Sequence, residues 1–310
     1  MHDIMIYSFC HEISIFLISG GHMSKDRYDA KRVELPGLMQ CCIDLKPGRM
    51  ENEVYMNFDI DVTNLTRYIE EKKAAGEHIT YFQAFVAAIG KVMYSRPKLN
   101  RFVSNRHMYE HKEVVLSFVA KMDLNDKSEE IMLCIPIAPE DNMAAIAEKV
   151  QKKIENLRSK KVEKKGANSA IDKLCKLPNI IRVPIFGVIK LLAKKGKLPP
   201  SLAKDNIYFS SMIISNLGSI KCGAIYHNLA NFGSCSGLTT MGEIRTVKVY
   251  DDNGAETTKK VCEFGITLDE RIADGYYFAK SGKMIEYVLM HPELLEEPAG
   301  KKVEMPELRG

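Results

Sequence analysis

The sequence lacks most of the short motifs that identify enzyme classes. It has no G-x-G-x-x-G and no G-x-x-x-x-G-K-[ST] loop, so neither a dinucleotide-binding fold nor a P-loop is supported. It also has no G-x-S-x-G nucleophile elbow. Its eight cysteines include no C-x-x-C pair and no spacing typical of zinc ligands. We therefore expect free thiols in a reducing compartment, the cytoplasm, with no disulfide framework and no metal.

Long hydrophobic runs are absent from the N-terminal region. Residues 13–18 are apolar, but acidic residues and two histidines interrupt the surrounding sequence, and no Lys or Arg precedes it. A signal peptide needs a basic start and an unbroken apolar centre, and a spanning helix needs about 20 apolar residues. Met23 resembles a natural start. We therefore expect residues 1–22 to be a leader outside the fold and residues 23–50 to form an N-terminal arm.

The composition is that of a globular protein with an uneven charge. The 310 residues are 45% hydrophobic and 27% charged, which is enough for a large domain with ample core. Residues 149–204 carry sixteen Lys or Arg and three acids, although the whole chain has a net charge of only +4. Such a block can face phosphates or an anionic membrane, or it can be the solvated side of helices. Its Lys-rich part, 149–165, lacks interleaved aromatics, so we expect no nucleic-acid partner.

Hydrophobic periodicity divides the chain into mixed strands and helices. Strands are predicted over 54–60, 114–120, 131–137, 207–215, 245–250 and 259–268, and helices over 64–75, 80–94, 143–157, 180–192 and 276–290. Thr63 is the expected N-cap of the first helix, and Thr80 with Gln83 the expected capping box of the second. Turns are predicted at 105–106, 123–130 and 251–254. Because strict βαβ alternation is missing, we expect an α/β (α+β) fold with two layers, a mixed β-sheet covered by helices.

Four short segments resemble, in order, the catalytic domain of the 2-oxoacid dehydrogenase acyltransferase (dihydrolipoyl acyltransferase) family and of chloramphenicol acetyltransferase. Residues 96–100, after the helix at 80–94, are similar to the family's H-P-x-L-N. Residues 213–218 are similar to its T-I-[ST]-N-x-G strand end. Residues 269–275 resemble its D-H-R-x-x-D-G signature, and residues 291–295 match its C-terminal end. Together these segments span about residues 50 to 297.

The resemblance implies a chloramphenicol-acetyltransferase-like fold that assembles as a homotrimer. The active site would lie between neighbouring subunits, where a channel for coenzyme A meets one for the acyl acceptor. The expected domain covers 51–298, contains an insertion at about 160–205 that is foreign to the family pattern, and is followed by a polar tail at 299–310. Since there is no room for a lipoyl domain before residue 50, we expect no attached lipoate and no role as the core of a dehydrogenase complex.

The signature departs from the family at its catalytic base. The family's histidine, which takes a proton from a thiol, is replaced by Glu270. A glutamate with an ordinary pKa of about 4.3 lies about four units below a thiol, which corresponds to about 5–6 kcal/mol of unfavourable proton transfer. Burial, Asp269 and Asp274 would raise its pKa, and Arg271 would lower it. A second candidate base is His227, because by resemblance its segment runs close to the acyl channel, although a lone histidine between apolar residues is commonly structural.

The remaining site residues follow from the same resemblance. Ser215 matches the hydroxyl residue that donates a hydrogen bond to the tetrahedral oxyanion, a contact that contributes about 3–4 kcal/mol. The segment with Asn216 is also typical of a plain strand-to-turn junction. Asp274 is implied to form a salt bridge with an arginine that fixes the signature loop, in which Arg271 is a structural residue. Gly275 is implied to permit the turn that follows.

Three functions stay open from the sequence. The first is an acyltransferase that uses acyl-coenzyme A and an unidentified small-molecule or lipid acceptor. The second is a non-catalytic trimeric scaffold or acyl-thioester-binding protein, which the loss of the histidine favours. The third is an acyltransferase that contacts a membrane surface through residues 179–197, an apolar helix flanked by lysines. Pro184 and Gly187 argue against a regular amphipathic helix there.

Overall fold

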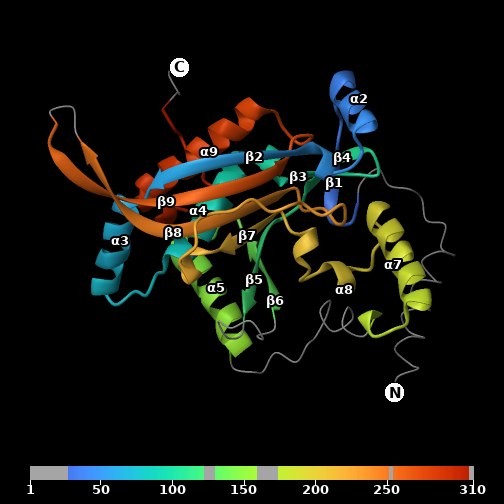
Figure 1. The fold of residues 1–310 in the computed structure, drawn as a ribbon, viewed down its shortest axis with the longest axis horizontal. Coiled ribbons are helices and arrows are strands. Elements are labelled where there is room, and N and C mark those ends of the chain that lie inside the picture. Colours follow the sequence, from blue (N-terminus) through green and yellow to red (C-terminus); the bar gives the residue numbers. More distant parts are fainter. Residues whose placement is uncertain (1–26, 122–129, 159–173, 251–253, 307–310) are drawn as a thin grey trace.

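The computed structural model describes residues 27–121, 130–158, 174–250 and 254–306 (Figure 1). The expected leader lies outside these residues. So do most of the turn at 123–130, the first part of the insertion, most of the turn near residue 251 and the end of the polar tail.

A six-stranded mixed sheet forms the centre of the molecule, in the order β2-β9-β8-β7-β5-β6. β7 runs parallel to β5 and to β8, and the other neighbours in this sheet are antiparallel. The bounds are β2 Glu53–Asp61, β5 Val114–Lys121, β6 Glu130–Ile137, β7 Met212–Asn216, β8 Gly237–Tyr250 and β9 Glu256–Asp269. The prediction of a mixed sheet is confirmed.

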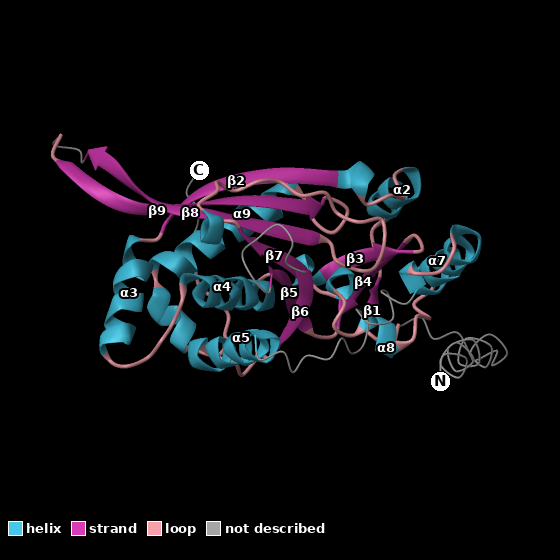
Figure 2. Cartoon of the chain, turned by 60° about the horizontal axis from the view of Figure 1, so that its bottom comes forward, coloured by secondary structure: helices cyan, strands magenta, loops and turns pink. Residues whose placement is uncertain are grey.

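Four helices pack together with one face of this sheet and bury the main core (Figure 2). They are α3 Thr63–Ala74, α4 Tyr81–Ser95, α5 Met143–Arg158 and α9 Gly275–Met290. α4 lies between α5 and α9, and every residue from Gln83 to Met93 is buried. This helix is apolar nearly all round because it has helix or sheet neighbours on several sides.

Helix starts show where a cap prediction holds and where it fails. The capping box of Thr80 and Gln83 is present in both directions, as predicted. Thr63 is not an N-cap, because it is already the first residue of α3. Its N–H donates to Asp61 Oδ1 at 2.9 Å, and its hydroxyl accepts from the Lys260 N–H at 2.9 Å. The Thr63 hydroxyl therefore links α3 to β9 instead of capping α3.

A smaller unit lies at one end of the sheet, where Figures 1 and 2 both show α2 and α7. It contains a three-stranded sheet in the order β1-β4-β3 and the helices around it. Asn105 and Arg106 form the predicted hairpin turn, with φ of 49° and 64°. The bounds are β1 Ala30–Val33, β3 Arg101–Ser104, β4 His107–His111, α2 Gly37–Leu45, α7 Asn179–Lys194 and α8 Pro200–Ala203.

Two strand predictions had the wrong limits. β7 starts only at Met212, because residues 207–209 form a 3₁₀ turn (η3, Ile207–Phe209) whose Tyr208 N–H donates to the Asn206 side chain. β8 starts at Gly237, eight residues before the predicted strand. Residues 237–242 are buried without alternation, so they carry no period-two signal. The other 3₁₀ turns are η1 Met50–Asn52, η2 Pro97–Asn100, η4 Gly218–Ile220 and η5 Pro292–Glu296.

Candidate active site

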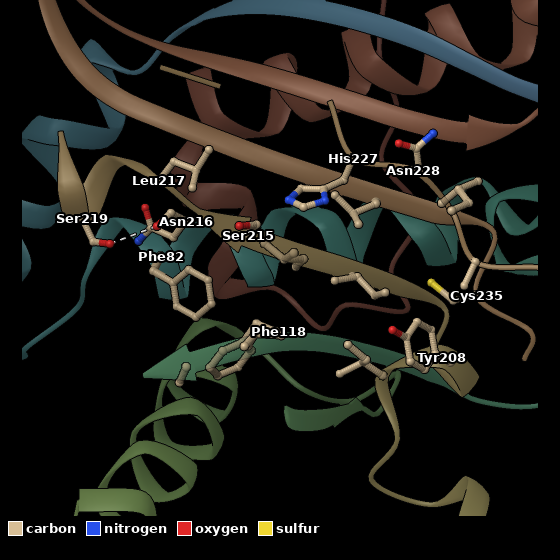
Figure 3. Close-up of a pocket in the computed structure, with 18 of the residues that line it drawn as sticks. Phe82, Phe118, Tyr208, Ser215, Asn216, Leu217, Ser219, His227, Asn228 and Cys235 are labelled. Atoms are coloured by element: carbon tan, nitrogen blue, oxygen red, sulfur yellow. Dashed lines mark hydrogen bonds between the residues drawn. The ribbon is translucent and has the colours of Figure 1, made fainter. Parts of the chain in front are cut away.

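A cavity of about 740 Å³ opens beside the end of β7 (Figure 3). Strands β5 and β7 and the loop at 227–232 supply most of its wall. Ser215, Asn216 and His227 all line it, so the structure brings three of the predicted site residues into one space. Glu270 does not line this cavity.

Ser215 and His227 both have unengaged polar groups. Within the described residues, neither side chain has a hydrogen-bond partner, and His227 is exposed while Ser215 is partly buried. The backbone carbonyl of Asn216 accepts a hydrogen bond from the Ser219 hydroxyl at 2.9 Å. A hydroxyl and an imidazole with free hydrogen-bonding capacity in one cavity can donate to an anionic oxygen and accept a proton.

The loop that carries His227 crosses the sheet face that the helices leave open. The Ile225 N–H donates to Thr240 Oγ1 of β8 at 3.0 Å, and the Leu229 N–H donates to Glu53 Oε1 of β2 at 2.5 Å. Gly265 of β9 allows this approach, because a Cβ there would lie 2.6 Å from the Ile225 carbonyl oxygen. The position of His227 therefore depends on contacts from three different strands.

Arg49 anchors the next part of the same loop. Its guanidinium donates to the carbonyl oxygens of Ala230 at 2.6 Å, Phe232 at 3.2 Å and Gly233 at 3.2 Å. The Arg49 Nε lies 3.6 Å from Asp269 Oδ2. Since Ala230 and Phe232 line the cavity, the buried Arg49 side chain helps to hold the cavity wall.

The signature loop is built on a buried ion pair between Asp269 and Arg271. Arg271 Nε lies 2.8 Å from Asp269 Oδ1 and Arg271 Nη2 lies 2.6 Å from Oδ2, which is a two-point contact. Arg271 also donates to the Pro47 carbonyl at 2.7 Å. Asp269 thus sits between two arginines and ties the loop to residues 47–49. The resemblance implied an arginine salt bridge at Asp274, whereas the partner of Arg271 is Asp269.

Glu270 lies outside this buried pair. Its N–H donates to the Asn52 carbonyl at 2.8 Å, so its backbone is fixed. Its carboxylate reaches outward to Lys46 Nζ at 3.3 Å, and the two side chains are 44% and 57% exposed. The Glu270 carboxylate is therefore solvent-exposed and not enclosed in an apolar site.

Two implied roles in the signature are wrong in the described structure. Among the described residues Asp274 has no salt-bridge partner; its side chain caps α9 by accepting the Tyr277 N–H at 2.8 Å. The loop is fixed by Asp269, which is buried, while Asp274 is exposed at a helix start. Gly275 does not have a positive φ, and a Cβ there would meet nothing within 4 Å. It is the first residue of α9, where ordinary helical angles suffice.

Cys235 also lines the cavity, but it is not suited to be a nucleophile. It is buried, its Sγ donates to the Gly237 carbonyl at 3.2 Å, and burial raises the pKa of its thiol. His107 and His111 lie on β4, and His107 contacts Arg32. Across the residues that the structure describes, no group of His, Cys, Asp or Glu is arranged to hold a metal ion.

Comparison with solved structures places the fold. A probable dihydrolipoamide acetyltransferase from Listeria monocytogenes is similar over 84% of this chain and 94% of its own, with a TM-score of 0.55 and 16% identity. The cubic core of a pyruvate dehydrogenase multienzyme complex is similar over 90% and 96%, with a TM-score of 0.56 and 16% identity. A chloramphenicol acetyltransferase is similar over 84% and 99%, with a TM-score of 0.50 and 10% identity.

These similarities confirm the fold predicted from the four motifs. The chain has the fold of dihydrolipoamide acetyltransferase catalytic cores and of chloramphenicol acetyltransferase. No family model and no curated protein matches the sequence.

Some site residues had no signal in the sequence. Arg49 is one of several basic residues in the polar region before residue 50, and no nearby sequence pattern predicts its contact with Asp269. Glu53, which holds the His227 loop, sits at a strand start. The Asp269–Arg271 pair could have been found, because the signature places an acid and an arginine two residues apart.

Proposed function

We propose that the protein is an acyltransferase and that the cavity beside β7 is its active site. The observation that carries this proposal is that Ser215 and His227, a hydroxyl and an imidazole without partners among the described residues, line the same cavity. The fold likeness to acetyltransferase cores supports it. Acyl-coenzyme A is the proposed co-substrate.

His227 is the proposed base. An amine, hydroxyl or thiol acceptor gives its proton to the imidazole as it attacks the thioester carbonyl, and the carbonyl oxygen becomes an oxyanion. The Ser215 hydroxyl donates a hydrogen bond to that oxyanion. The intermediate collapses by breaking the carbon–sulfur bond, and the leaving thiolate takes the proton from the imidazolium. Imidazole suits this exchange because its ordinary pKa lies nearer that of a thiol than a carboxylate's does.

The phosphates of coenzyme A would lie outside the cavity. None of the described side chains that line it is a Lys or Arg, so it offers a phosphate no cationic partner of that kind. Lys221 directly follows the lining residues Ser219 and Ile220 and is exposed, so it is a candidate cation at the mouth. Part of the basic insertion is a further candidate.

Substitution with matched controls tests the two roles. The measurement is coenzyme A release from acyl-coenzyme A over a panel of acceptors. Ser215→Ala is expected to lower kcat about 100- to 1,000-fold, whereas Ser219→Ala, in the same cavity but already bonded to Asn216, is expected to change it little. His227→Gln is expected to lower kcat about 100- to 10,000-fold, and His78→Gln, on an exposed loop, is the control. Full activity in both main variants would refute the assignment.

Glu270 is the competing base if the protein assembles as the proposed homotrimer, in which one copy's Glu270 would face another copy's cavity. The apolar side chains Leu38 and Leu45, exposed on α2, offer a surface for such contacts. Sedimentation should then give three times the chain mass of 35.0 kDa. Glu270→Gln would abolish turnover if Glu270 is the base, and would leave it within about twofold if His227 is.

A non-catalytic thioester-binding protein is the second candidate function. It is favoured by the position of Glu270, which is ion-paired with Lys46 and half exposed where the family has its histidine. Binding of acyl-coenzyme A without turnover in the wild type, together with turnover in Glu270→His, would establish it.

We also propose that α7 contacts an anionic membrane surface. The helix is continuous from Asn179 to Lys194 despite Pro184 and Gly187. Its exposed side chains include Ile180 at 85%, Val183 at 63% and Leu191 at 51%. Its inner side packs Leu192 and Ala193 towards Phe209 and Phe232.

The charges of α7 favour lipid over a protein partner of mixed charge. Its charged residues are Arg182, Lys190 and Lys194, all basic. An apolar face with cations beside it is typical of helices that lie in an anionic membrane interface. No described helix is long and apolar enough to cross a membrane, so contact would be at the surface.

Vesicle co-sedimentation tests this contact. Binding is expected to vesicles that contain phosphatidylserine, and the double variant Ile180→Gln/Leu191→Gln is expected to weaken it at least about tenfold. Tyr250→Gln/Tyr276→Gln, which changes two exposed aromatics on other elements, is the control. Equal binding by both variants would exclude α7 as the contact.

A further inference from the structure

None of the described residues that line the cavity is a Lys, Arg, Asp or Glu. Its polar side chains are Ser215, Asn216, Ser219, His227 and Asn228, and Tyr208 and Cys235 each carry one weakly polar group. The other thirteen lining residues are apolar. A lining of this kind favours an uncharged and mainly hydrocarbon occupant, because a buried charge without a partner is costly.

The volume is too large for an acetyl group. Cavities that hold drug-sized molecules usually measure about 300–1,000 Å³, and this cavity measures about 740 Å³. An acetyl group has three non-hydrogen atoms. If the reacting carbonyl sits at Ser215, most of the cavity remains to be filled by something else.

The end of the cavity near Cys235 has several buried apolar residues. Figure 3 shows Asn216 and Ser219 at one end of the view, Cys235 and Tyr208 at the other, and Ser215 and His227 between them. Around Cys235 the lining residues Ile207, Leu229 and Leu238 are also buried. The ring of Phe232 packs edge-on against Tyr208, with centroids 5.9 Å apart. The wall at this end is therefore mostly apolar.

We infer that this apolar end holds the hydrocarbon chain of the acyl group, and that the protein transfers acyl chains considerably longer than acetyl. This inference rests on the proposed acyl transfer at Ser215 and His227. The thioester carbonyl lies between these two side chains, and the chain extends towards Cys235, Leu229 and Leu238.

Affinity measured against chain length tests the inference without requiring turnover. Titration calorimetry is made with acetyl-, butanoyl-, octanoyl- and dodecanoyl-coenzyme A. Each buried methylene is expected to tighten binding about three- to fourfold, so octanoyl-coenzyme A should bind at least about 100-fold more tightly than acetyl-coenzyme A. Equal affinities across the series would overturn the inference.

A second test places a larger side chain in the cavity. Ala230 lines the cavity, and its side chain takes no part in holding Arg49, which bonds only its carbonyl. Ala230→Phe is expected to lower the affinity for octanoyl-coenzyme A at least about tenfold and to leave that for acetyl-coenzyme A nearly unchanged. Ala144→Phe, at an exposed position on α5, is the control for the same change. A uniform loss for both ligands would contradict the chain site, and circular dichroism shows whether each variant is folded.

Competition by neutral alcohols separates this inference from the proposed function. We expect 1-decanol to bind, 1-butanol to bind far more weakly, and 1-decanol to compete with octanoyl- but not with acetyl-coenzyme A. If 1-decanol binds and no acyl-coenzyme A does, the apolar site stands and the acyltransferase proposal falls. If 1-decanol and octanoyl-coenzyme A bind independently, the cavity holds the acceptor, and the acyl-chain inference is refuted.

Discussion

Two ion pairs on adjacent residues of the signature loop lie in opposite environments. Asp269 and Arg271 are 0% and 2% exposed, and their contact is bidentate. Glu270 and Lys46 are 44% and 57% exposed and meet through a single contact. The difference teaches that the loop is held by the residues on either side of Glu270. The Glu270 side chain can therefore change without disturbing the backbone that carries it.

The largest effect is expected from Asp269→Asn. The substitution leaves Arg49 and Arg271 buried without their shared carboxylate, and breaking a buried pair costs about 3–5 kcal/mol. The free energy of unfolding, measured by denaturant titration, should fall by that amount. Asp274→Asn is the matched control, because asparagine also caps helices well and the loss should stay below about 0.5 kcal/mol. Equal losses would mean that the buried pair does not hold the loop.

Gly233→Ala probes the other end of the Arg49 network. Gly233 has a φ of +77°, and a Cβ there would lie 2.0 Å from the Tyr208 carbonyl oxygen. Gly254 has a similar φ of +79° with nothing within 4 Å. Gly254→Ala should cost about 1–2 kcal/mol for its backbone angles alone, and Gly233→Ala about 1–3 kcal/mol more for the clash. Thermal unfolding of the two variants gives the difference, and similar midpoints would contradict it.

The buried His111 is expected to make the stability of the protein depend on pH. Its ring packs on Phe102 with centroids 4.5 Å apart, its Nε2 lies 3.3 Å from the Ser234 carbonyl, and burial lowers its pKa to about 4. In the unfolded chain His111 is protonated below about pH 6.5, whereas in the folded chain it is protonated only below about pH 4. Stability should therefore fall as the pH drops through this window, by up to about 3 kcal/mol.

The measurement is the denaturation midpoint between pH 4 and 7, compared with His111→Phe. The variant should lose this part of the pH dependence. Asp29, Arg27 and Arg49 also act on His111, and they are unchanged in the variant. Parallel curves for the two proteins would exclude His111 as the source.

The smallest effect is expected from Glu270→Gln. An exposed ion pair contributes about 0–1 kcal/mol, so the free energy of unfolding should change by less than that. The change should shrink further in 1 M salt, which screens exposed charges. A loss comparable to that of Asp269→Asn would erase the distinction between the two pairs.

The sequence predicted elements that depend on neighbours in the chain. The capping box of Thr80 and Gln83, the turn at Asn105 and Arg106 and the amphipathic α5 all need only residues a few positions apart. The first half of β8 was missed, because a strand buried on both faces has no alternation to detect. The N-cap at Thr63 was wrong, because a distant strand and Asp61 use its polar atoms.

In the candidate site, too, residues in local motifs were predicted and residues that act through distant contacts were not. Ser215 and the signature at 269–275 were found from local motifs, and the fold around them is confirmed. Their partners were not found, since Arg49 reaches Ala230 across 181 positions and Glu53 reaches Leu229 across 176. No local pattern encodes such contacts.

By itself, then, the sequence determined the order of most helices and strands, the type of fold and the replacement of a histidine by Glu270. The tertiary structure alone decided that His227 shares a cavity with Ser215 and that Glu270 does not. The physical reason is that caps, turns and periodicity are properties of short segments, whereas a cavity is enclosed by segments that meet only when the core packs.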